Sequence, residues 1–216
     1  NNSVEIYGPS FSNFVRSVML VCEENEVNYK TGFDIKGEKV EYKSAEHYQL
    51  HPFGKLPVLI HDNLVLPETA AICRYIQTVF SKSTQGTFTT QQLASIDAFS
   101  ALISINIDKA IMRDYLLEFA FPKGENGAVR FDKVSEAQPE VRNALKVVEN
   151  ELINGVSLDN ASLTIADILL APMLHYLTTL PTDFNLLNEF DLANQYFNRL
   201  MERESFNKIL VSKPSE

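Results

Sequence analysis

The sequence has no tryptophan and only two cysteines, Cys22 and Cys73, among its 216 residues. The two cysteines lie far apart, each within an apolar segment of helical pattern, and there is no CxxC pair or cluster. This pattern argues against a disulfide framework or a zinc site and favours two buried thiols. No apolar run approaches the roughly 18 residues of a membrane-spanning helix, and the first residues lack the apolar region of a signal peptide.

Basic residues are also in short supply, with 19 Lys and Arg against 28 Asp and Glu, a net charge of −9 and a pI near 5.0. Such a balance argues against nucleic acid or an anionic membrane as the main partner. The missing signal region leads us to expect a cytoplasmic protein. Hydrophobic residues make up 45% of the chain, enough to build a sizeable core in one large or two small domains.

The first half alternates short extended and helical patterns. Strands are expected at 4–7, 28–35, 58–60 and 64–66, and helices at 14–24, 41–50 and 69–80. Asp62-Asn63 between the last two strands is a hairpin signal. The order strand, helix, strand, helix, strand, strand, helix is that of a thioredoxin-like α/β domain, which we place at residues 1–80.

The composition changes after residue 80. Residues 81–90 are polar and rich in helix breakers, which is typical of a linker. All the remaining patterns are helical, so residues 91–216 are expected to form an all-helical second domain. Its helices are expected at about 91–121, 134–152, 164–180, 188–201 and 202–210, with a loop at 122–130.

A capping box is expected at the start of the third of these helices. Thr164 fits the N-cap position, and Asp167 takes the place of the usual Glu or Gln three residues later. The apolar run that follows indicates a buried core helix. Asp167 is therefore interpreted as a folding residue and not as a catalytic one.

The segment His51–Ile76 is the most informative part of the chain. A tight turn at 52–54 leads to Leu56-Pro57, where a cis peptide bond is inexpensive and would turn the main chain of Leu56 outward. Glu68-Thr69 falls where the next helix begins, so a ligand carboxylate can meet backbone N–H groups there. The carboxylate of Glu68 itself suits a ligand ammonium. These features predict a site for a small peptide.

This segment resembles the glutathione-binding half of the cytosolic glutathione transferases. Their pattern is P-x-G-x-(V/I/L)-P, followed about ten residues later by an acidic residue and Ser, which here is Glu68-Thr69. The resemblance extends over essentially the whole chain. It implies that glutathione is the co-substrate, that it is bound by Leu56, Pro57, Glu68 and Thr69, and that no prosthetic group or metal is required.

The turn at residues 8–16 is expected to supply the hydroxyl that stabilises a thiolate. The spacing of Ser12, Phe14 and Arg16 resembles the serine-type tau, phi and theta classes, which makes Ser12 our candidate. Asn13 and Ser10 stay open as alternatives. Tyr7 matches the tyrosine of other classes loosely but lies within the first strand. The structural alternative is that Ser10 and Ser12 are turn serines that cap a helix.

Two lysines are candidates for holding a second carboxylate. Lys43, followed by Ser44, resembles the Lys-Ser pair with which the tau class holds the glycine carboxylate of glutathione, and Lys55 precedes the Leu-Pro pair. His47 and His51 stand four residues apart, but no third ligand is apparent. We therefore expect them to be surface histidines and not metal ligands.

Two further expectations concern apolar residues. Phe53, at the turn, is expected near the interface of a homodimer, with packing within its own chain as the alternative. A small apolar electrophile is expected between the residue 8–14 turn and the long helix. Its candidate lining residues are Phe11, Ile103, Ile107, Ile111, Met112 and Tyr115.

The predicted activity is that of a glutathione transferase. A glutathione-dependent peroxidase, isomerase or dehalogenase on the same fold is the second interpretation, and a non-catalytic binding or regulatory module is the third. A disulfide reductase is disfavoured because there is no cysteine near position 12. The motifs mix tau and phi features with a second half that resembles bacterial proteins, so a bacterial source is expected.

Overall fold

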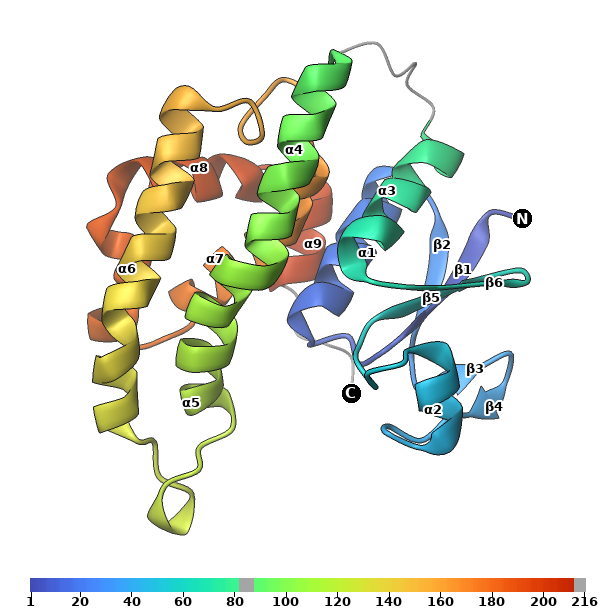
Figure 1. Ribbon diagram of the computed structural model, residues 1–216, viewed down its shortest axis with the longest axis horizontal. Helices are drawn as coiled ribbons and strands as arrows, with labels where there is room; N and C mark the ends of the chain where they lie inside the picture. Colours follow the sequence, from blue (N-terminus) through green and yellow to red (C-terminus); the bar gives the residue numbers. More distant parts are fainter. Residues whose placement is uncertain (82–87, 212–216) are drawn as a thin grey trace. The chain divides into compact units, whose positions relative to one another are not determined.

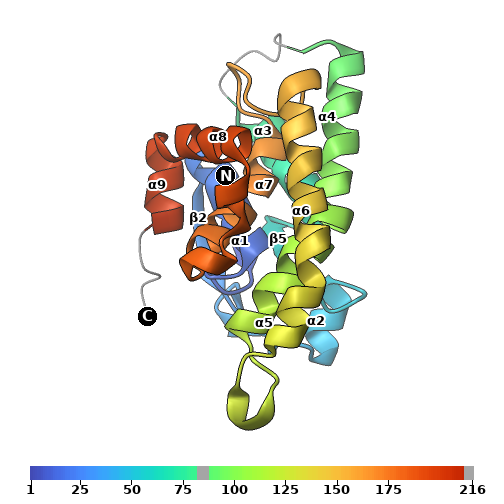
Figure 2. The same ribbon diagram turned by 90° about the vertical axis from the view of Figure 1, so that its left-hand side faces the viewer.

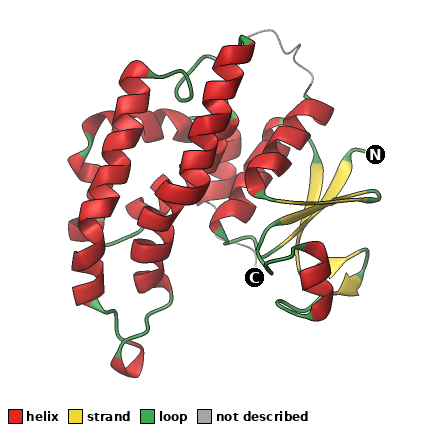
Figure 3. Ribbon diagram, in the orientation of Figure 1, coloured by secondary structure: helices red, strands yellow, loops and turns green. Residues whose placement is uncertain are grey.

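The computed structural model describes residues 1–81 and 88–211. They form two compact units, one of residues 1–81 and 202–211 and the other of residues 88–201. Among the described residues, strands occur in the first unit alone (Figure 3). The predicted linker at 81–90 lies partly outside the described residues, and so does the end of the chain after residue 211.

The first unit is built on a four-stranded sheet in the order β2-β1-β5-β6. β1 (Ser3–Tyr7) pairs in parallel with β2 (Asn28–Gly32) and antiparallel with β5 (Val58–His61), which pairs antiparallel with β6 (Leu64–Pro67). Helices α1 (Asn13–Glu24) and α3 (Thr69–Phe80) pack together on one face, while α2 (Ala45–Leu50) lies on the other (Figure 1). Every residue of β5 is buried because both faces of the sheet are covered.

This order of elements confirms the predicted thioredoxin-like domain, with two corrections. The strand expected at 28–35 ends at Gly32, which has a φ of +128°, and β3 (Asp34–Ile35) instead pairs with β4 (Glu38–Lys39) in a separate ribbon. The helix expected at 41–50 begins only at Ala45. Lys43 has a left-handed φ of +60° and Ser44 caps the helix, so the chain cannot be helical earlier.

The second unit is helical. α4 (Thr90–Leu102) continues through segments of wider, π-helical winding at Ile103–Ile107 and Lys109–Leu116 into α5 (Leu117–Ala120). A short turn of 3₁₀ helix at Glu125–Gly127 precedes α6 (Phe131–Asn154), which runs alongside the π-helical part (Figures 1 and 2). α7 (Ile165–Thr178) is the core helix. Two 3₁₀ turns, Thr182–Phe184 and Leu186–Glu189, lead to α8 (Asp191–Met201).

The π-helical winding explains two ion pairs that an α-helix does not form. Arg113 bonds to Asp108 and Lys109 to Asp114, and in each pair the partners are five residues apart. Five residues complete about 1.4 turns of an α-helix, which points the two side chains in different directions. They complete close to one turn of a helix with i→i+5 hydrogen bonds. The helix expected at 91–121 is therefore one continuous rod whose middle is wound differently.

The last helix, α9 (Glu204–Val211), packs on α1 in the first unit. The buried Arg16 donates a hydrogen bond of 2.8 Å to the carbonyl of Leu210 near the end of α9. Arg203 forms a two-pronged ion pair with Glu24. The sequence prediction placed residues 91–216 in the helical domain, whereas these bonds tie the described part of α9 to the first unit.

The predicted capping box at the start of α7 is present. The N–H of Thr164 donates to Oδ2 of Asp167 at 2.9 Å, and the Thr164 hydroxyl accepts from the N–H of Asp167 at 3.2 Å. The hydroxyl of Tyr196 and the N–H of Asp159 donate to the other carboxylate oxygen. Burial raises the pKa of Asp167, although these hydrogen bonds act to lower it.

The substitution Asp167→Asn is expected to lower the free energy of unfolding by about 2–3 kcal/mol, since an amide presents a donor where the buried carboxylate accepts hydrogen bonds. Urea denaturation followed by circular dichroism measures the change. Asp132→Asn is the matched control, because Asp132 is an exposed first-turn residue of α6. Equal effects of the two substitutions would contradict the assigned role.

Candidate active site

The register of the sheet brings three segments together at the edge that is formed by one end of its strands. Tyr7 is paired with Val58, and Val58 is paired with Pro67. The next residues along these strands, Gly8, Pro57 and Glu68, therefore follow one another across the edge. α1 and α3 both begin at this edge (Figure 1), so two helix N-termini lie at the carboxyl ends of β1 and β6. Edges of this kind are where α/β folds bind ligands.

Gly8 makes room for the close approach of these segments. Its φ is +145°, and it exchanges two hydrogen bonds of 2.8 Å with Gly32. A methyl group at Gly8 would lie 2.6 Å from a methyl of Val15 and 3.5 Å from the Cβ of Leu56. The turn after β1 is thus in contact with the Leu56-Pro57 segment.

The Leu56-Pro57 peptide bond is cis, as expected from the sequence. In the described part of the chain, neither the N–H nor the carbonyl of Leu56 has a hydrogen-bond partner. The adjacent Val58 already belongs to the ladder with β1 and β6. Leu56 therefore offers one donor and one acceptor to an extended ligand at the edge of the sheet.

Ser12 is the N-cap residue of α1, but its side chain makes no capping hydrogen bond. The residue is half-buried, as is Ser10. Asn13 is different, because both polar atoms of its amide are buried and lack a partner among the described residues. Of the three candidates, Ser12 combines a half-buried side chain with the N-cap position of α1.

Tyr7 has a structural role. Its side chain is buried, and its hydroxyl donates a hydrogen bond of 2.8 Å to the carbonyl of Val40. Burial raises the pKa of this phenol, and the neighbouring Glu41 and Tyr42 act in the same direction. The hydroxyl is therefore already engaged on the α2 side of the sheet.

Glu68 and Thr69 stand at the start of α3. Glu68 is the N-cap residue, with a φ of +74°, and its side chain makes no capping bond. The first backbone N–H groups of this helix are therefore left uncapped by Glu68, and together with the helix dipole they favour an anion. The exposed carboxylate of Glu68 lies beside these N–H groups and favours a cation instead.

His51 joins Glu68 to the turn that carries Phe53. The N–H of Phe53 donates to Nδ1 of His51 at 3.1 Å, so the hydrogen of the neutral ring is on Nε2. Nε2 then donates to the Glu68 carboxylate at 3.0 Å. The expectation that His47 and His51 lie on the surface was wrong, because both are buried. The four-residue spacing of the two histidines in a short, mostly polar segment did not indicate that they are buried.

The side chains of Lys43 and Lys55 are exposed, one before α2 and the other after it. Lys43 places its ammonium over the ring of Tyr42, 5.5 Å from the ring centre. Phe53, between the two lysines in sequence, is 75% exposed. Among the described residues there is no group of three or more His, Cys, Asp and Glu side chains arranged to hold a metal ion.

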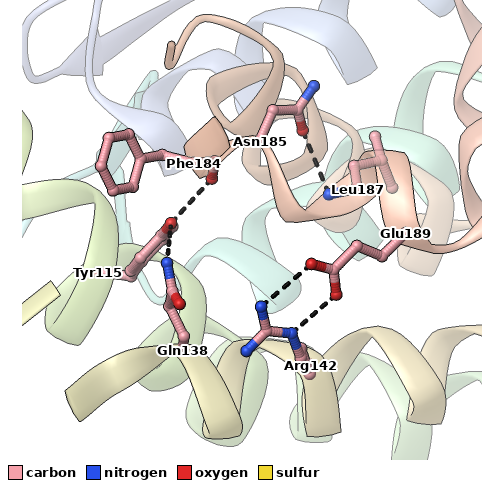
Figure 4. Close-up of polar contacts among 7 residues, drawn as sticks. All are labelled: Tyr115, Gln138, Arg142, Phe184, Asn185, Leu187 and Glu189. Carbon is pink, nitrogen blue, oxygen red and sulfur yellow. Dashed lines mark hydrogen bonds and ion pairs between the residues drawn. The ribbon is translucent and has the colours of Figure 1, made fainter. Parts of the chain in front are cut away.

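The residues expected to bind an electrophile fall in both units. Phe11 is exposed in the first unit, whereas Ile103, Ile107, Ile111, Met112 and Tyr115 are buried in the second. The hydroxyl of Tyr115 donates to the carbonyl of Phe184 and accepts from Gln138, next to the ion pair of Arg142 with Glu189 (Figure 4). Tyr115 thus connects α6 to the 3₁₀ turns after α7 through these hydrogen bonds. Its assignment to an electrophile site stays a prediction.

Comparisons with known proteins agree with this architecture. The family model of the glutathione S-transferase N-terminal domain matches residues 3–78, and that of the C-terminal domain matches residues 110–204. Glutathione S-transferase 4 of Zea mays is 25% identical over 98% of this chain and 94% of its own length. Glutathione S-transferase 1 of Triticum aestivum is also 25% identical, over 99% and 96%.

Solved structures show the same fold. Maize glutathione S-transferase I in complex with an atrazine glutathione conjugate superimposes with a TM-score of 0.80 at 22% identity, covering 96% of both chains. A glutathione S-transferase I bound with lactoylglutathione gives a TM-score of 0.79 at 22% identity, over 96% of this chain and 98% of the other. The bacterial source expected from the second half of the sequence stays a prediction.

The close approach at Gly8 can be tested with a matched pair of glycines. Gly8→Ala and Gly32→Ala both place a side chain at a strained positive φ, which costs about 1–3 kcal/mol. Only at Gly8 does the added methyl meet a neighbour within 4 Å. Gly8→Ala is therefore expected to lower the free energy of unfolding by about 1–3 kcal/mol more than Gly32→Ala in urea denaturation. Equal losses of unfolding free energy would show that the turn after β1 moves to accommodate the methyl group at no energetic cost.

Proposed function

The chain belongs to the glutathione S-transferase family, and we propose that Ser12 stabilises the thiolate of glutathione for attack on a small apolar electrophile. Glutathione is the co-substrate of this transferase. The observation that carries the proposal is the edge of the sheet at Gly8, Pro57 and Glu68, where a free main-chain segment and two helix N-termini meet. The sulfur, the peptide backbone and the terminal charges of a tripeptide each find a suitable group there.

In the proposed complex, glutathione lies extended along this edge. The cysteinyl residue pairs with the N–H and carbonyl of Leu56, which the fold leaves unpaired. Its γ-glutamyl end lies at the start of α3, with the carboxylate on the first N–H groups of the helix and the hydroxyl of Thr69, and the ammonium on Glu68. The glycine carboxylate extends toward Lys43 and Lys55.

The chemistry requires the thiol to be ionised near neutral pH. A thiol pKa of about 8.5 must fall by roughly 2 units, which corresponds to about 2.7 kcal/mol. One hydrogen bond to a charged acceptor contributes about 1.5–3 kcal/mol, and a helix N-terminus adds about 0.3–1 kcal/mol. Ser12 at the start of α1 offers both contributions, so no general base is needed. Activation and proximity to the electrophile then account for catalysis.

Replacement of the proposed hydroxyl gives a direct test. Ser12→Ala is expected to lower kcat for conjugation of glutathione to a chloronitrobenzene acceptor at least tenfold near pH 6.5, a loss of about 1.4 kcal/mol or more. The rate of the variant should recover as the pH rises past about 8.5, because the thiol then ionises without help. A pH–rate profile of wild type and variant measures both effects.

Ser10→Ala is the matched control, since it removes a half-buried hydroxyl from the same turn. A Ser12→Ala variant as active as the wild type would move the role to Asn13 or Ser10. A wild type that binds glutathione without conjugating it would instead favour the peroxidase, isomerase or dehalogenase interpretation. A wild type that binds no glutathione would leave a non-catalytic module.

We further propose that the protein is a cytoplasmic homodimer with Phe53 at its interface. The carrying observation is that a large apolar side chain is exposed on a turn whose main chain is held by His51. Aromatic side chains are enriched among the residues that anchor contacts between chains. Within residues 1–81 and 88–211, no helix is long and apolar enough to cross a bilayer.

Phe53→Ser is expected to raise the dimer dissociation constant about tenfold or more, because a buried aromatic anchor is lost. Sedimentation velocity over a range of protein concentrations measures it. Phe121→Ser is the control, since Phe121 is a similarly exposed phenylalanine of the second unit. The proposal is wrong if the wild type is a monomer, or if both variants have the same dimer dissociation constant as the wild type.

A further inference from the structure

His47 is fully buried on α2, and both nitrogens of its ring are bonded to main-chain groups. The N–H of Lys43 donates to Nδ1 at 2.9 Å, so Nδ1 acts as an acceptor. The hydrogen of the neutral ring is therefore on Nε2, which donates to the carbonyl of Lys55 at 3.0 Å. One ring thus connects two peptide groups that are twelve residues apart in sequence.

The ring also has a fixed orientation. It packs edge-on against the buried ring of Tyr7, with 4.9 Å between ring centres, and lies 5.5 Å from the ring of Tyr42. Lys43, one of the two residues it holds, has a φ of +60°, which is unfavourable for a residue with a Cβ atom. The bond to His47 is therefore placed where the main chain most needs support.

We propose that His47 is a positioning residue that sets the separation of Lys43 and Lys55, so that both ammonium groups reach the one carboxylate at the glycine end of glutathione. This inference rests on the proposed function. Lysine side chains are long and flexible, and two of them converge on a small anion at low entropic cost only when their main-chain attachments are fixed. His47 fixes both attachments at once without touching the ligand.

Three substitutions of His47 remove one or both of these hydrogen bonds. His47→Phe fills the space but removes both hydrogen bonds. His47→Asn keeps an acceptor near the place of Nδ1, and His47→Gln keeps a donor near the place of Nε2, so each retains one bond. Should the phenylalanine variant fail to fold by circular dichroism, the two amide variants carry the test.

Each variant is compared on glutathione and on its glycine monoethyl ester, which lacks the glycine carboxylate. Titration calorimetry gives the dissociation constants, and conjugation kinetics give kcat and KM. For His47→Phe we expect KM and the dissociation constant for glutathione to rise about tenfold, with kcat unchanged. For the ester we expect changes below about twofold, because the affected lysines then have no anion to hold. The asparagine and glutamine variants should fall between wild type and phenylalanine.

His61→Phe is the matched control. His61 is another buried histidine of the first unit, on β5, and its ring bonds to the hydroxyl of Tyr75 and the carbonyl of Asn1 instead of to the site. It should alter the constants for neither ligand.

Four results would overturn the inference. Equal weakening of glutathione and its ester by His47→Phe would show a merely structural role, and so would the same effect from His61→Phe. Unchanged glutathione binding in His47→Phe would overturn the inference while leaving the proposed function intact. A wild type that binds neither compound would overturn both.

Discussion

The pairing of Val58 with Tyr7 on one side and Pro67 on the other is the constraint on which the site depends. It aligns the end of β1, the start of β5 and the end of β6, so that Gly8, Pro57 and Glu68 become neighbours. A shift of one residue in the pairing of β1 would bring Glu5 to the positions of the buried Val4 and Ile6. The hydrophobic core, which buries every residue of β5, therefore disfavours such a shift. The site therefore takes its geometry from the core.

Buried polar side chains extend this order to the segments outside the sheet. His47 connects the two ends of the α2 region, and His51 connects the Phe53 turn to Glu68. Each ring accepts one main-chain N–H bond and donates its own hydrogen onward, which neither a charged nor an apolar side chain can do. Lys43 and Lys55, proposed to hold glutathione, have long and flexible side chains by contrast. In our proposal, the histidines hold the main chain to which the exposed groups are attached.

Arg16 shows how a motif residue can serve the fold. It was recognised through its spacing from Ser12, yet its guanidinium lies buried and donates to the carbonyl of Leu210. α1 carries Ser12 at its start and Arg16 one turn later, so the same helix presents the proposed hydroxyl and receives the C-terminal helix. Ion pairs from Arg203 and Lys208 to Glu24 and Glu23 strengthen this contact. The proposed catalytic turn is therefore braced by residues nearly two hundred positions away.

Local sequence determined much of this protein. The period of the apolar residues defined α1, α3 and the helices of the second unit, and the Leu56-Pro57, Glu68-Thr69 and Thr164–Asp167 motifs located the cis bond, the start of α3 and the capping box. Each of these depends on neighbours within a few residues.

The tertiary structure alone decided the rest. The burial of His47 and His51, the attachment of α9 to α1 and the early end of β2 depend on partners distant in sequence, and periodicity carries no information about those. The spacing from Arg16 favoured Ser12, with Asn13 and Ser10 as alternatives. Their environments depend on packing, which buries the amide of Asn13 without a partner among the described residues and leaves the Ser12 side chain without a capping bond.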